Sequence, residues 1–252
     1  MKHNIDEWRY NILRSNSRVA MPIMTHPGIE LINSTVQEAV TCGETHFKAL
    51  EVLYQKYPTA AVTMIMDLTV EAEAFGCKIN FEEDDIPNVA DRLISEVGEI
   101  DNLTVPNISE SARLSEYLKA SKLAVQNIKD VPVFPGCIGP FSLAGRLIDM
   151  SEIMVDIYLY PDSIHNLLQK CTAFIKEYIS AYKALGTNGI VIAEPAAGLL
   201  GNDECSQFSS DYIKDIVDEF QDDDFLIILH NCGHEGGLTQ TMVETGVKAL
   251  HL

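Results

Sequence analysis

The two side chains best suited to chemistry are a histidine and a cysteine two residues apart, in the stretch His230-Asn231-Cys232-Gly233. An apolar run over 225–229 precedes them, so both can point into one cavity where a strand ends and the chain turns. Imidazole nitrogen and thiolate sulfur are ligands that zinc binds readily, which makes His230 and Cys232 candidate metal ligands. A catalytic zinc usually has three protein ligands, so the spacing alone leaves a packed histidine beside a small apolar cysteine as the alternative.

Two carboxylates also follow apolar runs, and both are candidate catalytic residues. Glu194 ends the run 189–193 and precedes Pro-Ala-Ala-Gly, whose small residues allow a ligand close to the backbone. Its alternative role is to cap the N-terminus of the following helix. Asp67 ends the run 62–66, where it can hydrogen-bond a substrate nitrogen or act as an acid or base. Its alternative role is that of a helix N-cap.

A glycine-bracketed turn, residues 136–141, and a histidine supply the candidate substrate-binding residues. Gly136, Cys137 and Gly139 lie in this turn, which enters a helix and can present backbone N–H groups to an anionic group. The turn lacks the lysine of a Walker loop and does not match GxGxxG. His26 ends the first candidate strand, so we expect it to face the same mouth. His234 is read as a surface residue, and the cysteines in or beside helices as packing residues.

Strands and helices that alternate along the chain must position these side chains. Continuous apolar strands joined by helices indicate a parallel sheet buried on both faces. Polar residues at the carboxyl ends of successive strands favour a closed (β/α)8 barrel over an open sheet. We expect one domain, residues 1–252, with about six of eight units and an acidic insertion over 81–110. The expected helices cover 35–57, 110–128 and 163–185, and the expected strands cover 18–25, 60–67, 131–137, 189–194, 225–230 and 247–252.

Composition restricts the partners and the compartment. The chain has 252 residues and a formal net charge of −19, and such an acidic surface repels nucleic acid. The N-terminal residues are polar, without the apolar core of a signal peptide, and no segment approaches the roughly 20 apolar residues that cross a bilayer. The six cysteines are scattered rather than arranged as a disulfide framework. We therefore expect a cytoplasmic protein that binds neither nucleic acid nor membrane.

With these residues in place, the chain resembles the uroporphyrinogen decarboxylase (URO-D) superfamily. The similarity runs from about Arg18 to the last residue and is most specific at 66–81, 136–147, 189–200 and 229–237. The decarboxylases carry an arginine-rich stretch after the first strand, whereas residues 24–29 here read Met-Thr-His-Pro-Gly-Ile. The His-x-Cys-Gly motif is instead similar to that of the cobalamin-dependent methyltransferase branch.

The resemblance implies a zinc-dependent methyl transfer from a corrinoid protein to a thiol such as coenzyme M. In that branch the equivalents of His230 and Cys232 bind zinc, and a cysteine of the last strand completes the set. The family's chains continue for two more units, so we expect this chain to be incomplete at its C-terminus and to lack that cysteine. Two alternatives stay open: tetrapyrrole decarboxylation dependent on Asp67, and a non-catalytic corrinoid- or thiol-binding fragment. The unpaired strand edges predict self-association or poor solubility.

Overall fold

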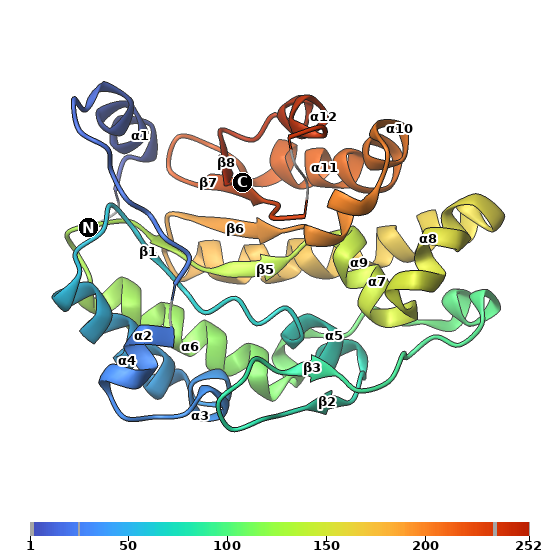
Figure 1. Cartoon of the computed structure of the whole chain (residues 1–252), viewed down its shortest axis with the longest axis horizontal. Coiled ribbons are helices and arrows are strands. Elements are labelled where there is room, and N and C mark those ends of the chain that lie inside the picture. The colour runs from blue at the N-terminus through green and yellow to red at the C-terminus, as the bar shows by residue number, and fades with distance from the viewer. Residues whose placement is uncertain (1–2, 25, 234–235, 252) are drawn as a thin grey trace.

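The computed structural model describes residues 3–24, 26–233 and 236–251, and its centre is a parallel sheet (Figure 1). Each of its paired strands runs in the same direction as its neighbour. The pairing order is β5 (Gly136–Ile138), β6 (Gly189–Ala193), β7 (Leu226–His230) and β8 (Ala249–His251). Directly before β5 in the chain, β4 (Val133–Phe134) pairs with β1 (Val62–Thr63).

Helices lie outside this sheet, as apolar strands buried on both faces require. Figure 1 shows α9 behind β5 and β6, α4 and α6 below them, and α11 beside β7. The helices are α1 (Ile5–Arg14), α2 (His26–Leu31), α3 (Val36–Thr41), α4 (Gly43–Lys56), α5 (Val70–Phe75), α6 (Ala112–Asn127), α7 (Pro140–Ile148), α8 (Met150–Leu159), α9 (Pro161–Ala184), α10 (Asn202–Cys205), α11 (Asp211–Phe220) and α12 (Thr239–Glu244). Short 3-10 helices are η1 (Val97–Asn102), η2 (Ile108–Glu110) and η3 (Pro195–Leu199), and a π-helical turn, η4 (Ser206–Ser210), joins α10 to α11.

The prediction of a first strand over 18–25 is wrong for its described residues, 18–24, which form neither helix nor strand. They nevertheless run beside β1, because the Ala60 N–H donates to Ala20 O at 3.0 Å and Thr63 Oγ1 donates to Pro22 O at 3.1 Å. A proline has no backbone N–H to give to a ladder, so Pro22 interrupts regular pairing here. Residues 18–24 therefore occupy a strand position without forming a regular ladder of strand hydrogen bonds.

Other strands are shorter than their apolar runs predicted. The run 60–67 yields only β1, and the run 131–137 is divided into β4 and β5 at Pro135. The carbonyl of Pro135 still accepts from the Val191 N–H at 2.8 Å, so β4 and β5 act as one strand position. Counting 18–24, six consecutive strand positions of an α/β barrel are present. The fold class expected from the sequence is confirmed.

The expected helices are largely confirmed, with one division. The regions 110–128 and 163–185 form α6 and α9, while the region 35–57 is split at Cys42 into α3 and α4. The expected insertion holds an antiparallel hairpin of β2 (Ile79–Asn80) and β3 (Asn88–Val89), followed by η1 and η2. Among the described residues, none of the helices combines the length and the apolar character that crossing a bilayer requires.

Strands β6 and β7 approach each other so closely at Gly189 that the fold needs a glycine there. A Cβ added at Gly189 would lie 2.1 Å from Leu226 O and 2.8 Å from Leu226 N, both backbone atoms that cannot move aside. We expect Gly189→Ala to lower the free energy of unfolding by at least about 2 kcal/mol, measured by urea unfolding followed by circular dichroism. Gly98→Ala is the control, because nothing lies within 4 Å of its Cβ position. Equal unfolding midpoints for the two variants would contradict the strand packing described.

Candidate functional site

The carboxyl ends of β5, β6, β7 and β8 lie in one row. Ile138 pairs with Ala193, Ala193 with His230, and His230 with His251. Because all four strands are parallel, the residues that follow this row gather at one edge of the sheet. The alignment brings two of the predicted residues, Glu194 and His230, to adjacent strand ends.

Backbone hydrogen bonds continue one step beyond the row. The Gly139 N–H donates to Ala193 O at 2.7 Å, the Glu194 N–H to His230 O at 2.8 Å, and the Asn231 N–H to His251 O at 3.1 Å. These bonds fix where each loop leaves its strand. The edge of the barrel is therefore held by main-chain contacts, independently of the side chains it presents.

His230 is half-buried and contacts a second histidine that the sequence did not single out. Its Nδ1 lies 2.9 Å from His251 Nδ1 and 3.1 Å from the backbone oxygen of His251. Burial, with the charge of His230, lowers the pKa of His251, so this ring is neutral at neutral pH. Anchoring one ring nitrogen in this way leaves Nε2 of His230 as the nitrogen available to a ligand. No motif marks His251; only its position in the row identifies it.

The loop that carries Cys232 is shaped by Asn231. The buried Asn231 amide donates to Glu194 O at 2.9 Å, and its Oδ1 accepts from the Gly233 N–H at 2.8 Å. Gly233 also packs against Gly198, where a Cβ would lie 2.5 Å from the carbonyl carbon of Gly233. The loops after β6 and β7 thus hold each other, and Cys232 is left exposed. His234 of the same loop lies outside the described residues.

The side chains of His230 and Cys232 are of types that bind zinc, but two described ligands are fewer than a complete zinc site needs. A half-buried imidazole and an exposed thiol are soft and borderline donors of the kind that zinc selects. Within residues 3–24, 26–233 and 236–251, His230 and Cys232 do not belong to any group of three ligand atoms that lie within 4.8 Å of one another. The residues present therefore fit part of a zinc site.

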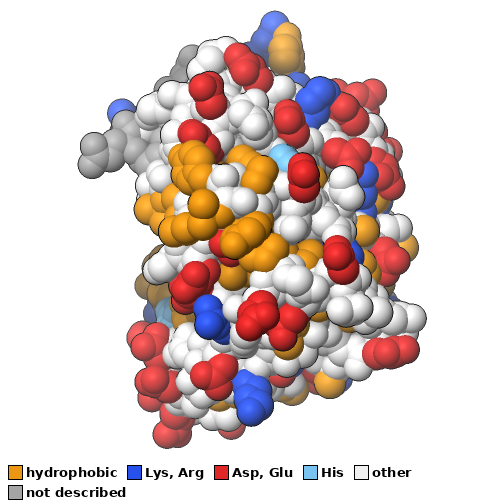
Figure 2. All heavy atoms as spheres, turned by 90° about the vertical axis from the view of Figure 1, so that its right-hand side faces the viewer, with side chains coloured by type: hydrophobic (Ala, Val, Ile, Leu, Met, Phe, Trp, Pro, Cys, Tyr) orange, Lys and Arg blue, Asp and Glu red, His pale blue; other side chains and the backbone are white. Residues whose placement is uncertain are grey.

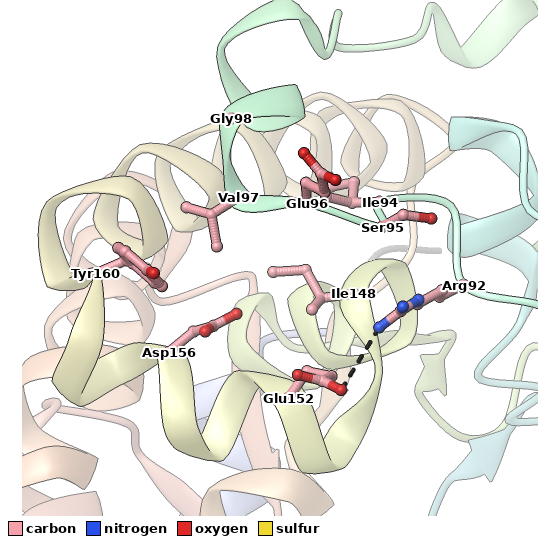
Figure 3. A pocket seen from close by; sticks show the side chains of 10 residues that line it. All are labelled: Arg92, Ile94, Ser95, Glu96, Val97, Gly98, Ile148, Glu152, Asp156 and Tyr160. Carbon is pink, nitrogen blue, oxygen red and sulfur yellow. Dashed lines mark ion pairs between the residues drawn. The ribbon is translucent and has the colours of Figure 1, made fainter.

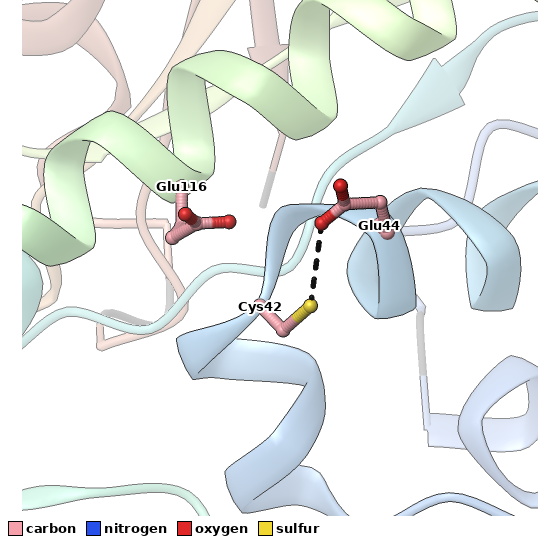
Figure 4. Close-up of side chains that lie close together, drawn as sticks. All are labelled: Cys42, Glu44 and Glu116. Atoms are coloured by element: carbon pink, nitrogen blue, oxygen red, sulfur yellow. Dashed lines mark hydrogen bonds between the residues drawn. The ribbon is translucent and has the colours of Figure 1, made fainter.

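A group of three such ligands occurs elsewhere, at Cys42, Glu44 and Glu116 (Figure 4). Glu116 accepts from the Gly43 N–H at 2.6 Å, and the Cys42 thiol donates to Glu44 at 3.5 Å. The ammonium of Lys119 lies 2.6 Å from Glu44 and 3.7 Å from Glu116. These carboxylates already have a cation and a helix N–H as partners, so the group stabilises the start of α4.

Glu194 is fully buried and caps a helix, but not the one that follows it. Its two carboxylate oxygens accept from the Phe141 and Ser142 N–H groups at the start of α7, each at 2.8 Å. Burial raises the pKa of Glu194 to about 7, against the lowering effect of these hydrogen bonds. A Cβ on Gly139 would lie 2.4 Å from the Glu194 carboxyl carbon, so this position requires glycine. The N–H groups of the 136–141 turn do meet an anionic group, and it is one of the protein's own.

Asp67 is buried in an ion pair with a residue that the sequence analysis missed, Arg113 of α6. The guanidinium of Arg113 contacts Asp67, Glu73 and Thr69, and it is only 6% exposed. The other oxygen of Asp67 accepts from the Thr69 N–H at 3.0 Å and hydroxyl at 2.7 Å. Nothing in the sequence pattern distinguishes Arg113 from a solvated arginine on an amphipathic helix.

Glu71 and Cys137 line a small cavity beside this ion pair, together with Asp67, Tyr117 and Tyr178. Glu71 Oε1 accepts from the Ile138 N–H at 3.0 Å, whereas its buried Oε2 has no hydrogen-bond partner among the described residues. Burial raises the pKa of Glu71 to about 7, and it raises the pKa of the Cys137 thiol well above its ordinary value. Cys137 is thus a neutral, packed thiol.

The remaining substrate-binding candidates lie apart from one another. Gly136 is half-buried, and a Cβ there would come within 2.9 Å of Met66. His26 is exposed at the first position of α2, and among described contacts no hydrogen bond or ion pair joins it to the strand-end residues. A further histidine, His46, is fully buried and accepts from the Ile65 N–H at 2.9 Å. Burial lowers the pKa of His46 to about 3, so it is a neutral acceptor that holds the backbone at Ile65.

A parallel α/β barrel with polar side chains at its strand ends is typical of a large class of enzymes. Comparison with known proteins shows to which family within that class the chain belongs. The family model described as uroporphyrinogen decarboxylase (URO-D) matches residues 17–252. This chain belongs to the uroporphyrinogen decarboxylase family. A solved structure described as a methyltransferase from Methanosarcina mazei has a TM-score of 0.84 at 22% identity, covering 99% of this chain and 76% of that one. The fold is therefore the URO-D type of TIM barrel.

Curated relatives fall into both branches of the family. The chain is 30% identical over 194 residues to methylcobamide:CoM methyltransferase MtbA of Methanosarcina mazei, covering 75% of this chain and 57% of that protein. It is 27% identical to the corresponding MtaA of Methanosarcina barkeri, covering 84% and 63%. It is 28% identical to uroporphyrinogen decarboxylase of Legionella pneumophila (strain Lens), covering 78% and 57%. The chain spans somewhat more than half the length of these relatives.

The buried carboxyl of Glu71 predicts a pH dependence of stability. The unfolded chain loses this proton near the ordinary pKa of 4.5, whereas the folded chain keeps it up to about 7. Stability from this group is therefore complete below 4.5 and falls as pH rises to 7, by about 3 kcal/mol. We expect Glu71→Gln to match the wild type near pH 4.5 and to exceed it in unfolding free energy at pH 8, measured by urea unfolding.

The control for this prediction is Glu177→Gln, which removes an exposed carboxylate on α9. It should leave the difference between pH 4.5 and pH 8 as in the wild type. If the Glu71→Gln and wild-type stabilities stay parallel across this range, Glu71 is ionised in the folded protein.

Proposed function

We propose that this chain is the barrel of a zinc-dependent methyltransferase, which moves a methyl group from a corrinoid protein to a thiol acceptor in the cytoplasm. The observation that supports this most directly is the position of His230 and Cys232 at the end of β7. One nitrogen of His230 is anchored on the next strand, and Cys232 is exposed on a loop fixed by Asn231. A half-buried imidazole and an accessible thiol at a barrel mouth suit a metal that activates a second thiol.

The choice of branch within the family rests on residues 24–29. A substrate with several carboxylates, such as uroporphyrinogen, needs cations to hold it, and this stretch contains no arginine. The net charge of −19 opposes such a substrate further. Two of the relatives carry the name methylcobamide:CoM methyltransferase, which matches a corrinoid donor and a thiol acceptor such as coenzyme M.

In this proposal His230, through Nε2, and Cys232 hold the zinc. Zinc bound there would supply the charge that keeps an acceptor thiol deprotonated at neutral pH. The acceptor thiolate then forms a bond to the methyl carbon of the methyl-corrinoid substrate as the carbon–cobalt bond breaks, and both electrons of that bond stay on the cobalt, which is reduced. The corrinoid protein docks at the mouth formed by the strand ends.

Asp67 and Glu194 orient the substrate in this proposal through the groups that they hold. Glu194 fixes the start of α7 and, with it, the turn that bears Gly136, Cys137 and Gly139. Asp67 holds the guanidinium of Arg113 in place beneath the mouth. Gly136 and Gly139 stay candidate substrate contacts in this proposal, whereas we assign Cys137 to packing, because its thiol is buried and neutral. His26, exposed at the start of α2, remains a candidate contact for an incoming substrate.

The metal assignment predicts a specific pattern of zinc binding. We expect the purified protein to bind zinc, and His230→Ala and Cys232→Ser each to lower its affinity at least about tenfold, since each removes one ligand. Cys42→Ser is the matched control, because Cys42 lies at the separate α4 cluster and should leave zinc affinity unchanged. Metal content after dialysis and competition with a chromogenic chelator measure this. Equal zinc retention by all four proteins would remove the basis of the proposal.

The runner-up function, tetrapyrrole decarboxylation, is favoured by Asp67, which follows β1 in the chain, and by the decarboxylase relatives. It would need no metal and would depend on Asp67. Because residues 24–29 lack arginine, we expect no coproporphyrinogen from uroporphyrinogen in an anaerobic fluorescence assay. With methylcobalamin and a thiol we expect demethylation, followed by the change in the cobalamin spectrum. Decarboxylation that persists in Cys232→Ser and fails in Asp67→Asn would select the runner-up instead.

A further inference from the structure

A second cavity lies away from the strand ends, between the segment around η1 and helices α7 and α8 (Figure 3). Its volume is about 520 Å³, within the range of roughly 300–1,000 Å³ that small-molecule sites occupy. None of the residues that line it belongs to the site described above. The proposed function therefore leaves this cavity unexplained.

Asp156 of α8 is the unusual group in this cavity. Its side chain is only 8% exposed, and its carboxylate has no hydrogen bond or ion pair with any described residue. Figure 3 shows this carboxylate pointing into the cavity, between Ile148 and the ring of Tyr160. The residue as a whole is mostly buried, and drawing a carboxylate partly out of water without a partner carries a cost. Burial, with the nearby charge of Glu152, raises the pKa of Asp156, which is the expected response to that cost.

The other charges of the cavity leave it with an excess of negative charge. Arg92 and Glu152 pair with each other, Nη1 to Oε1, at 3.6 Å (Figure 3). Glu96 adds a third carboxylate on the opposite wall. The lining residues therefore include one guanidinium and three carboxylates, of which that of Glu96 points away from Asp156 in Figure 3, in a chain whose net charge is −19. The electrostatic environment favours a cation over an anion.

The remaining walls are apolar and argue against a bare metal ion. Ile94, Val97 and Ile148 line the cavity, and Tyr160 presents a ring over which a cation can lie. Within the described part of the chain, the carboxylates here do not form a group of three ligand atoms within 4.8 Å of one another. A ligand that combines positive charge with an alkyl chain matches both the carboxylate and the walls.

We propose that this cavity binds a primary alkylammonium group, with the ammonium at Asp156 and the alkyl chain along Ile94, Val97 and Ile148. The ammonium donates hydrogen bonds to a carboxylate that otherwise has none, and the chain fills apolar space. Two sources offer this chemistry: a free alkylamine, or a lysine side chain of a docked protein. An exposed apolar patch beside the cavity, formed by Val155, Tyr158 and Leu159 of α8, offers a surface that a docked protein can bury (Figures 1 and 2).

The test is isothermal titration of the whole chain with n-butylammonium chloride. We expect saturable binding that Asp156→Asn weakens at least about tenfold, the equivalent of about 1.4 kcal/mol. Asp130→Asn is the matched control, since Asp130 is exposed on the loop before β4, and it should bind as the wild type does. Neutral 1-butanol should bind at least about tenfold more weakly than butylammonium. Asp156→Asn should fold at least as stably as the wild type, because it removes a buried charge without a partner.

A second pair of probes separates the two sources. Nα-acetyl-lysine amide carries the ammonium on a peptide unit, and Nα-acetyl-norleucine amide lacks the charge. Tighter binding of the lysine probe than of butylammonium assigns the site to a protein side chain, and weaker binding assigns it to a free amine. The proposal is overturned if butylammonium does not bind the wild type, if Asp156→Asn binds it equally well, or if 1-butanol or the norleucine probe binds as tightly as its charged counterpart.

Discussion

The parallel hydrogen-bonded register of β5, β6, β7 and β8 is the constraint on which the rest of this structure depends. It places Ile138, Ala193, His230 and His251 in one row, and the main-chain bonds beyond the row fix where each loop begins. A shift of one residue in any strand would turn its side chains to the opposite face. The imidazole of His230 would then no longer meet β8. The chemistry proposed for the barrel mouth therefore rests first on backbone geometry, and only then on side-chain type.

Buried charge at this edge is held by groups from distant parts of the chain. Asp67 is paired with Arg113, and Glu194 accepts two N–H groups of α7, so each carboxylate links a strand end to a helix outside the sheet. Glu71 differs, because one of its oxygens has no described partner. Unpaired buried carboxyls respond by taking up a proton. The mouth thus combines two carboxyl groups that are held by described partners with one whose second oxygen has none.

Most of the architecture could be predicted from the periodicity of apolar residues. Where the observed strands differ from the predicted ones, the cause lies in the local sequence. The runs 189–194 and 225–230 became β6 and β7 almost unchanged, because neither contains a residue that interrupts a ladder. The runs 18–25 and 131–137 contain prolines, which lack the N–H that strand pairing needs, so one gave no strand in its described part and the other was divided. Propensity and apolar pattern describe one segment at a time, whereas strand pairing depends on the backbone N–H donors of two neighbouring segments.

The sequence by itself determined the type of barrel, the position of His230 and Cys232 at a strand end, and the carboxylates that end their own strands. These features are local: an apolar run, a turn and a polar residue stand next to one another in the chain. Only the tertiary structure decided the partners of these groups: Arg113 for Asp67, the start of α7 for Glu194, and His251 for His230. Those contacts join residues 21 to 53 positions apart, and the one-dimensional spacing of residues carries no information about which distant side chains the packed core brings together.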